Sequence, residues 1–120
     1  MKMVGIRGAT VAEANTPEAI LAATRDLLLS LQEANPDLEP DNIASVLFTV
    51  TEDLTGVYPA QAARQLGWHH VPLMCAREIP VPGSLSRCVR ILIHWNTELS
   101  QDRIHHVYLK DAHYLRPELT

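Results

Sequence analysis

The sequence is poor in cysteine and in long apolar runs, and each shortage excludes a class of protein. Its 120 residues include two cysteines, Cys75 and Cys88, which are too few for a disulfide framework. No stretch approaches the roughly 20 apolar residues that a membrane span requires. The opening segment, MKMVGIRGATV, lacks the long apolar core of a signal peptide. We therefore expect a cytoplasmic protein with reduced thiols and no membrane partner.

The chain also lacks a basic excess and the common cofactor motifs. Its formal charge of −4 argues against a protein that coats nucleic acid. It contains no phosphate-binding loop, no dinucleotide fingerprint and no nucleophile elbow. Its six histidines form two adjacent pairs and two single residues. Adjacent residues of a strand point to opposite faces, which is a poor geometry for zinc. We expect no metal, no cofactor and no nucleic-acid partner.

The residues that are present predict a single α+β domain over residues 1–120, with one long helix, one short helix and a mixed sheet of about five strands. A helix is expected over 17–34, because Thr16 can cap it and apolar residues recur at helical spacing until Asn35. A shorter helix begins at Pro59. The expected strands are 2–11, 43–51, 71–78, 87–97 and 104–109. One long helix covers one face of a sheet, so we expect the other face to meet a second copy.

Arg90 is the most unusual residue of the expected strands. It lies inside the apolar run CVRILI, where a structural strand would carry another apolar residue. An unpaired buried charge is very costly, so this guanidinium must be paired or must face a polar cavity. The pattern alone leaves two interpretations open: an ion pair with an acidic residue, or a donor for an anionic ligand. The planar fork of arginine suits the second role.

Three further arginines carry weaker signals. Arg7 lies between Ile6 and Gly8 in the first expected strand, and by itself is better explained as a solvent-facing residue. Its neighbouring glycines would permit the close approach of a ligand. Arg64 and Arg116 have ordinary surface explanations. What requires explanation is that two arginines interrupt apolar strands of an acidic protein.

The third and fifth expected strands carry other polar candidates. Cys75 is better explained as a small apolar residue than as a nucleophile, and Glu78 can be an ordinary surface acid. Strand alternation places these two residues on opposite faces. One site would hold both only if the strand bent or bulged near Pro80. Tyr108 can bury its ring while its hydroxyl stays in water.

Several segments together resemble a known family. In chain order they are GIRGATV, TEDL, YPAQAARQLGW, VPLMCAREIPVPGSL, RCVRIL and QDRIHHVYLKDAHYLRPEL. They are similar to the monofunctional chorismate mutases of the trimeric, mainly β class typical of some bacteria. The resemblance implies a cofactor-free isomerase that rearranges chorismate to prephenate in phenylalanine and tyrosine biosynthesis. It also implies a homotrimeric pseudo-α/β barrel with active sites between neighbouring chains.

The resemblance further implies roles for single residues. Arg90 would be the cation beside the ether oxygen of the breaking bond, while Glu78 and Cys75 would contact the ring hydroxyl of the substrate. Arg7 and Tyr108 would bind a carboxylate. Positions at the mouth and walls of the cleft would be Arg64, Arg116, Tyr58, Ala60, Met74 and Leu115.

Two alternatives remain beside this interpretation. A non-catalytic binding module for an aromatic-pathway metabolite would keep the arginines without turnover. A trimeric imine or enamine deaminase would share the architecture, although its characteristic segments are not seen here. The chain also departs from the family at Gln61, where some relatives have lysine, so we assign no binding role to this residue.

Overall fold

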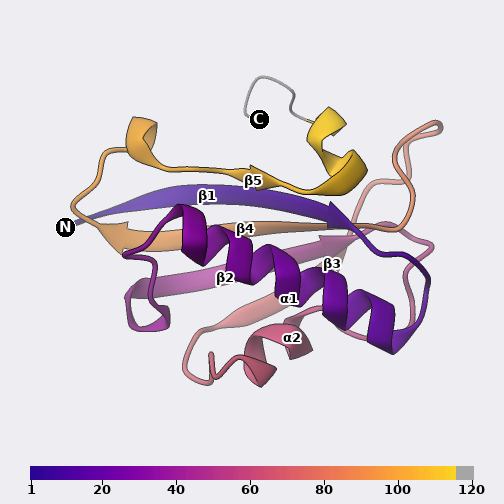
Figure 1. Cartoon of the computed structure of the whole chain (residues 1–120), viewed down its shortest axis with the longest axis horizontal. Coiled ribbons are helices and arrows are strands. Elements are labelled where there is room, and N and C mark those ends of the chain that lie inside the picture. Colours follow the sequence, from indigo (N-terminus) through magenta and orange to yellow (C-terminus); the bar gives the residue numbers. More distant parts are fainter. Residues whose placement is uncertain (116–120) are drawn as a thin grey trace.

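The computed structural model of the chain describes residues 1–115, which form a five-stranded mixed sheet with both α-helices on one face (Figure 1). The strands are β1 (Lys2–Val11), β2 (Ile43–Val50), β3 (Leu73–Arg77), β4 (Cys88–Thr97) and β5 (Val107–Tyr108). The helices are α1 (Pro17–Ala34) and α2 (Ala60–Gln65), with 3₁₀ helices at Pro40–Asn42, Gln101–Arg103 and Lys110–Leu115. The expected fold class, α+β with one long and one short helix, is confirmed.

The sheet order is β3-β2-β4-β1-β5. The central strand β4 pairs antiparallel with β1 and β2, whereas the outer strands β3 and β5 pair parallel with β2 and β1. The β1–β4 ladder runs without interruption from Lys2 opposite Thr97 to Val11 opposite Cys88. The two longest strands, of ten residues each, are therefore neighbours in the sheet.

Two expected strands are shorter than the sequence indicated. The third is confined to Leu73–Arg77, between Pro72 and the prolines that follow Glu78. The fifth is confined to Val107–Tyr108, because the side chain of Asn35 takes the place of a strand partner at His105. Asn35 Oδ1 accepts from the His105 N–H at 3.0 Å, and Asn35 Nδ2 donates to the His105 carbonyl at 2.9 Å. A contact between residues 70 positions apart leaves no trace in a local pattern.

Helix α1 begins and ends where its sequence indicates. Thr16 Oγ1 accepts from the Ala19 N–H at 3.1 Å, and the helix ends where the Asn35 N–H bonds the Leu31 carbonyl. Its apolar stripe packs on the sheet. Burial of Leu27 and Leu31, both fully inaccessible, contributes roughly 1.5–3 kcal/mol each through removal from water. No helix in residues 1–115 is long and apolar enough to cross a bilayer.

The alternation of β4 separates two faces of the sheet. Val89, Ile91, Ile93 and Trp95 are buried beneath the helices, whereas the intervening residues are only half-buried. Neither α-helix covers this second side, since α1 and α2 both lie on the side nearer the viewer in Figure 1. The 3₁₀ helix Lys110–Leu115 covers one end of it, where Ala112 packs on Ala9 and Cys88. We call this second side the open face. It carries Arg7, Ser45, Leu47, Thr49, Met74, Arg90, Leu92 and His94.

Candidate active site

Four of the residues selected from the sequence meet at one hollow of about 150 Å³ on the open face. Arg7 comes from β1, Arg90 from β4 and Tyr108 from β5, while Glu78 follows the end of β3. The sheet order explains the gathering, because β4, β1 and β5 are successive neighbours. Arg7 points to this face since Ile6 and Gly8 on either side of it are buried toward the helices. We call this the arginine hollow.

The charges of the arginine hollow do not balance. Arg90 Nη1 lies 3.5 Å from Glu78 Oε2, with side chains 37% and 25% exposed. The Arg7 guanidinium has no ion-pair partner among residues 1–115. The hollow is therefore lined by two guanidinium groups and one carboxylate, which leaves a positive excess in a protein of negative net charge. The ion pair of the first interpretation is present, and Arg90 also lines the hollow; its role as a donor for an anionic ligand stays a prediction.

Glu78 is fastened by two contacts from β2. Its N–H donates to the Val50 carbonyl at 2.9 Å. The Thr49 hydroxyl donates to Glu78 Oε2 at 2.5 Å. Thr49 also lines the arginine hollow, but our sequence reasoning did not select it. A threonine in a strand is unremarkable, and its partner lies 29 residues further along the chain.

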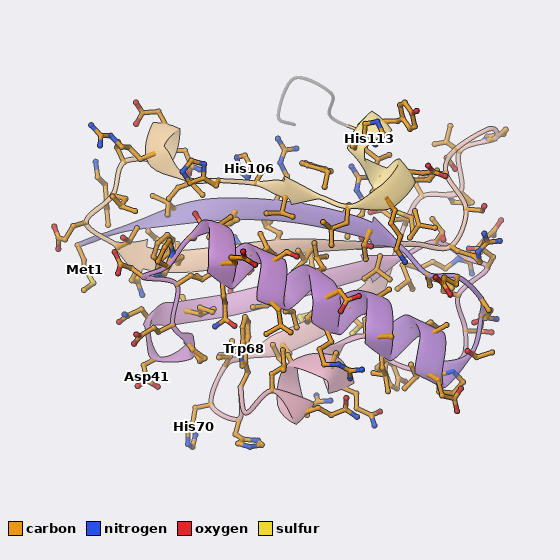
Figure 2. All side chains as sticks on the ribbon, in the orientation of Figure 1. Met1, Asp41, Trp68, His70, His106 and His113 are labelled. Atoms are coloured by element: carbon orange, nitrogen blue, oxygen red, sulfur yellow. The ribbon has the colours of Figure 1, made fainter. Side chains whose placement is uncertain are left out.

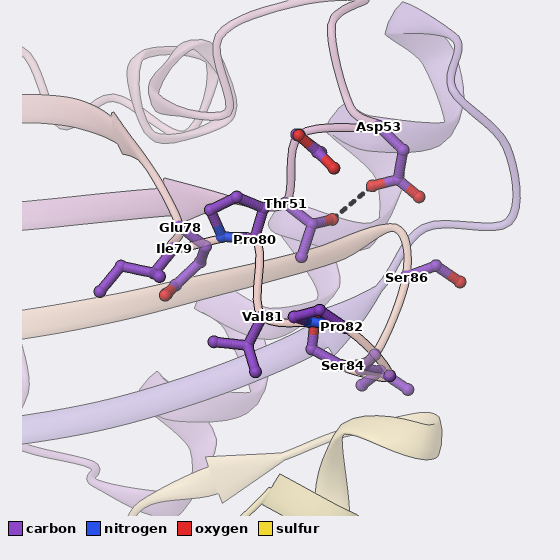
Figure 3. A pocket seen from close by; sticks show the side chains of 12 residues that line it. Thr51, Asp53, Glu78, Ile79, Pro80, Val81, Pro82, Ser84 and Ser86 are labelled. Carbon is purple, nitrogen blue, oxygen red and sulfur yellow. Dashed lines mark hydrogen bonds between the residues drawn. The ribbon is translucent and has the colours of Figure 1, made fainter.

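A second hollow of about 250 Å³ shares Glu78 and Arg90 with the first and extends to Leu115. Beyond it lies a third, of about 400 Å³, formed largely by the loop 78–86 (Figure 3). Glu78 stands at one edge of the third hollow, and Thr51 donates a hydrogen bond to Asp53 at the other. The loop after β3 therefore continues the surface of the arginine hollow toward the end of the described chain.

Asp53 binds the backbone at the end of that loop, directly before β4. Burial alone would raise the pKa of the Asp53 carboxyl, but hydrogen bonds from the Thr51 hydroxyl and the Arg87 N–H, together with the Arg87 charge, hold the pKa below its usual value. Both carboxylate oxygens lie close to the Arg87 N–H, at 2.9 and 3.1 Å. Arg87 has a positive φ of 49°, so Asp53 stabilises a strained turn directly before β4.

Cys75 lies at a different hollow. With Tyr58 it lines a space of about 630 Å³ at the β3 edge of the sheet. Its side chain packs toward the helix-side core, and no bulge brings it to the arginine hollow. Within one chain, the side chains of Cys75 and Glu78 therefore do not line the same hollow. Strand alternation had predicted that they point to opposite faces.

The remaining candidates are dispersed. Met74 is 68% exposed on the open face. Arg64 and Gln61 are exposed on α2, whereas Ala60 is buried and lines none of the hollows described above. Arg116 lies outside the described residues.

Neither the thiols nor the histidines form a cluster. Cys75 and Cys88 are both free. Burial raises the pKa of the Cys88 thiol to about 11, against the opposing charge of Arg90. His70 lies on the opposite side of the molecule from His106 and His113 (Figure 2). Within residues 1–115, no group of three or more His, Cys, Asp and Glu side chains is arranged to hold a metal ion.

Comparison with known proteins identifies the family. The family model described as chorismate mutase type I matches residues 3–119. The chain belongs to the chorismate mutase type I family. This confirms the resemblance drawn from the segments of the sequence, and with it the assignment of the chain as an enzyme of the isomerase class.

Relatives of the chorismate mutase type I family match nearly the whole chain. The protein named Chorismate mutase AroH from Thermus thermophilus is 59% identical over 115 residues, covering 96% of this chain and 94% of that protein. Chorismate mutase AroH from Bacillus subtilis (strain 168) is 42% identical over 121 residues, covering 100% and 94%. The solved structure of a chorismate mutase from Clostridium thermocellum superposes with a TM-score of 0.89 at 48% identity, covering 92% of this chain and 97% of that one.

Proposed function

We propose that the chain catalyses the intramolecular Claisen rearrangement of chorismate to prephenate, and that the arginine hollow binds the substrate. The observation that carries this proposal is that Arg7 and Arg90 line one hollow that contains a single carboxylate, Glu78. A doubly negative substrate supplies the charge that this hollow lacks. Membership of the chorismate mutase type I family supports this choice of reaction.

The first contribution to rate is conformational. Chorismate reacts only from a compact form in which the two carbons that join lie close together. We assign Arg7 and Tyr108, which line the hollow from β1 and β5, to one carboxylate of the substrate, while Arg90 lines the hollow from β4. Holding the substrate in this form removes much of the entropic cost of the reaction before chemistry begins.

The second contribution is electrostatic. One carbon–oxygen bond breaks while one carbon–carbon bond forms, and negative charge grows on the ether oxygen as its bond lengthens. A guanidinium fixed beside that oxygen favours the transition state over the ground state. A millionfold acceleration needs about 8 kcal/mol, and one preorganised donor typically supplies about 3–4 kcal/mol. Arg90 is the residue we assign to this role, with Glu78 contacting the ring hydroxyl.

We propose further that the active enzyme is a homotrimer whose sites lie between chains. The part of the open face that no helix covers supports this, because Leu47, Leu92 and Met74 are not fully buried there. The separation of Cys75 and Tyr58 from the arginine hollow supports it too, since a neighbouring copy can bring that second wall to Arg90. Light scattering should then give three times the chain mass of 13.4 kDa.

The proposed product is the precursor of phenylalanine and tyrosine, so the enzyme would act in their biosynthesis, and we propose the cytoplasm as its compartment. The deciding experiment adds chorismate to the purified chain, follows the loss of its diene absorbance above the spontaneous rate, and identifies prephenate. Binding without conversion would instead support a binding module. Inertness toward chorismate with hydrolysis of an imine would support a deaminase.

A further inference from the structure

The Glu78 carboxylate is held at one of its two oxygens. The Thr49 hydroxyl donates to Oε2 at 2.5 Å, and Arg90 Nη1 lies 3.5 Å from the same oxygen. Glu78 Oε1 has no hydrogen-bond partner among residues 1–115. The contact with Thr49 is a short hydrogen bond, whereas the contact with Arg90 is longer than the usual N–H···O range. Thr49 is therefore the group that sets the orientation of this carboxylate.

The strand register places Thr49 where it can do this. It lies opposite Arg90 in the β2–β4 ladder and opposite Ala76 in the β2–β3 ladder. Its side chain therefore stands on the open face between the strand that carries Arg90 and the strand that leads to Glu78. Since the Glu78 side chain is 25% exposed, it has room to adopt other rotamers if this hydrogen bond is lost.

The alternative arrangement would damage the arginine hollow. A carboxylate with both oxygens free pairs best with a guanidinium through two parallel N–H···O bonds. Such a pair between Glu78 and Arg90 would use the donors that Arg90 needs for the ether oxygen. The Thr49 hydroxyl competes for Oε2, so Arg90 keeps donors free and Oε1 stays available to the substrate.

We propose that Thr49 is a positioning residue, which acts through Glu78 by preventing a closed, two-bond pair between Glu78 and Arg90. This role rests on the proposed function of the hollow. It assigns to the reaction a residue that need not touch the substrate, and it makes the hydroxyl, not the shape, of Thr49 the property that matters.

The test compares two substitutions at this position. Thr49→Val keeps the shape and the β-branching but removes the donor, and we expect kcat/KM to fall about tenfold or more, mainly through kcat, because a hydrogen bond to a charged group is lost. Thr49→Ser restores the donor and should remain within about threefold of the wild type. Serine as impaired as valine, or valine as active as wild type, would overturn the proposal.

Thr10 offers a matched control. It is a buried strand threonine whose hydroxyl has no partner among the described residues, and it lies away from the arginine hollow. Thr10→Val should leave kcat/KM within about twofold of wild type and should not reduce stability, because it removes an unsatisfied buried hydroxyl. A loss of activity in Thr10→Val equal to that in Thr49→Val would show that any strand threonine behaves in this way, and would overturn the proposal.

A double-variant cycle separates positioning from a general structural effect. In a Glu78→Ala background Thr49 has nothing to orient, so adding Thr49→Val should change kcat/KM by less than about twofold. An equal loss in both backgrounds would refute action through Glu78. The same four proteins unfolded in urea should show non-additive midpoints, and additive midpoints would refute the contact. A wild-type chain without mutase activity would contradict the proposed function, while the urea cycle would still decide whether the two side chains are coupled.

Discussion

Cys75 and Glu78 lie three positions apart in the chain and yet face different hollows. Glu78 stands beside Arg90 on the open face, whereas Cys75 packs toward the helix-side core and lines the wall that also carries Tyr58. Alternation along β3 and its continuation explains the separation. Within one chain, the two side chains therefore do not line the same hollow. Among residues 1–115, no hydrogen bond joins the Cys75 thiol to a base, which favours a contact role over nucleophilic chemistry.

We therefore predict that Cys75→Ser keeps substantial activity. A hydroxyl can replace a thiol in a contact with the ring hydroxyl, so kcat/KM should fall by less than about tenfold. Steady-state kinetics with chorismate would measure this, and circular dichroism would check the fold. A folded variant with no activity at all would reopen covalent chemistry at this residue.

Arg90 should be far less tolerant. Arg90→Ala removes the donor assigned to the ether oxygen, and turnover should fall at least about 10²-fold. Arg90→Lys keeps the charge but loses the planar fork, and should also be severely impaired. The exposed Arg103 lies away from the arginine hollow. Arg103→Ala is therefore a control for the loss of one arginine, and its turnover should stay near that of the wild type. Near-normal turnover in a folded Arg90→Ala variant would contradict the electrostatic role, and near-normal kinetics in Arg90→Lys would show that charge alone suffices.

These residues also show what a sequence can reveal about a site. Arg90 was visible because a charge inside an apolar strand breaks a local pattern, and the opposite orientations of Cys75 and Glu78 followed from strand alternation. Thr49 was invisible because its significance depends on a partner brought close only by the sheet. The shortening of β5 has the same cause, since the amide of Asn35 reaches His105 across the fold. Local patterns predicted the elements, whereas contacts between distant segments required the structure.

Gly8 has a packing role that the sequence did not indicate. It lines the arginine hollow beside Arg7, and a Cβ at Gly8 would also meet the Val107 carbonyl at 3.0 Å and Leu27 Cδ1 at 3.1 Å. The close approach is therefore that of β5 and α1 to β1. Gly8→Ala should lower the free energy of unfolding by about 1–3 kcal/mol through overpacking.

Urea denaturation would measure this effect, and Gly5→Ala is its control. A Cβ at Gly5 would find its nearest neighbour, Leu92 Cδ1, at an ordinary 3.8 Å. Equal stability of the two alanine variants would contradict the packing explanation for Gly8.

The Cys88 thiol should be unreactive in the folded chain. Burial raises the pKa of Cys88 to about 11, so almost none of it is thiolate at pH 8, and its side chain is also inaccessible in the folded chain. Iodoacetamide should therefore label Cys88 only after unfolding. A Cys75→Ser variant isolates this thiol for mass spectrometry. Rapid labelling of folded Cys75→Ser at pH 8 would contradict the burial of Cys88.

Asp53 should make the loop before β4 sensitive to acid. The pKa of its carboxyl is lowered in the fold, as hydrogen bonds from Thr51 and Arg87 outweigh the effect of burial. A lowered folded pKa favours the ionised form in the native state. This carboxylate therefore stabilises the fold above its unfolded pKa of about 3.9, and the contribution is lost as the pH falls toward the folded value. Asp53→Asn should be less stable than wild type at pH 7, and the difference should shrink in acid. Urea denaturation of both proteins between pH 7 and pH 3 would measure it. A difference that stays constant over this range would mean that the shape of the Asp53 side chain, and not its charge, holds the strained backbone of Arg87.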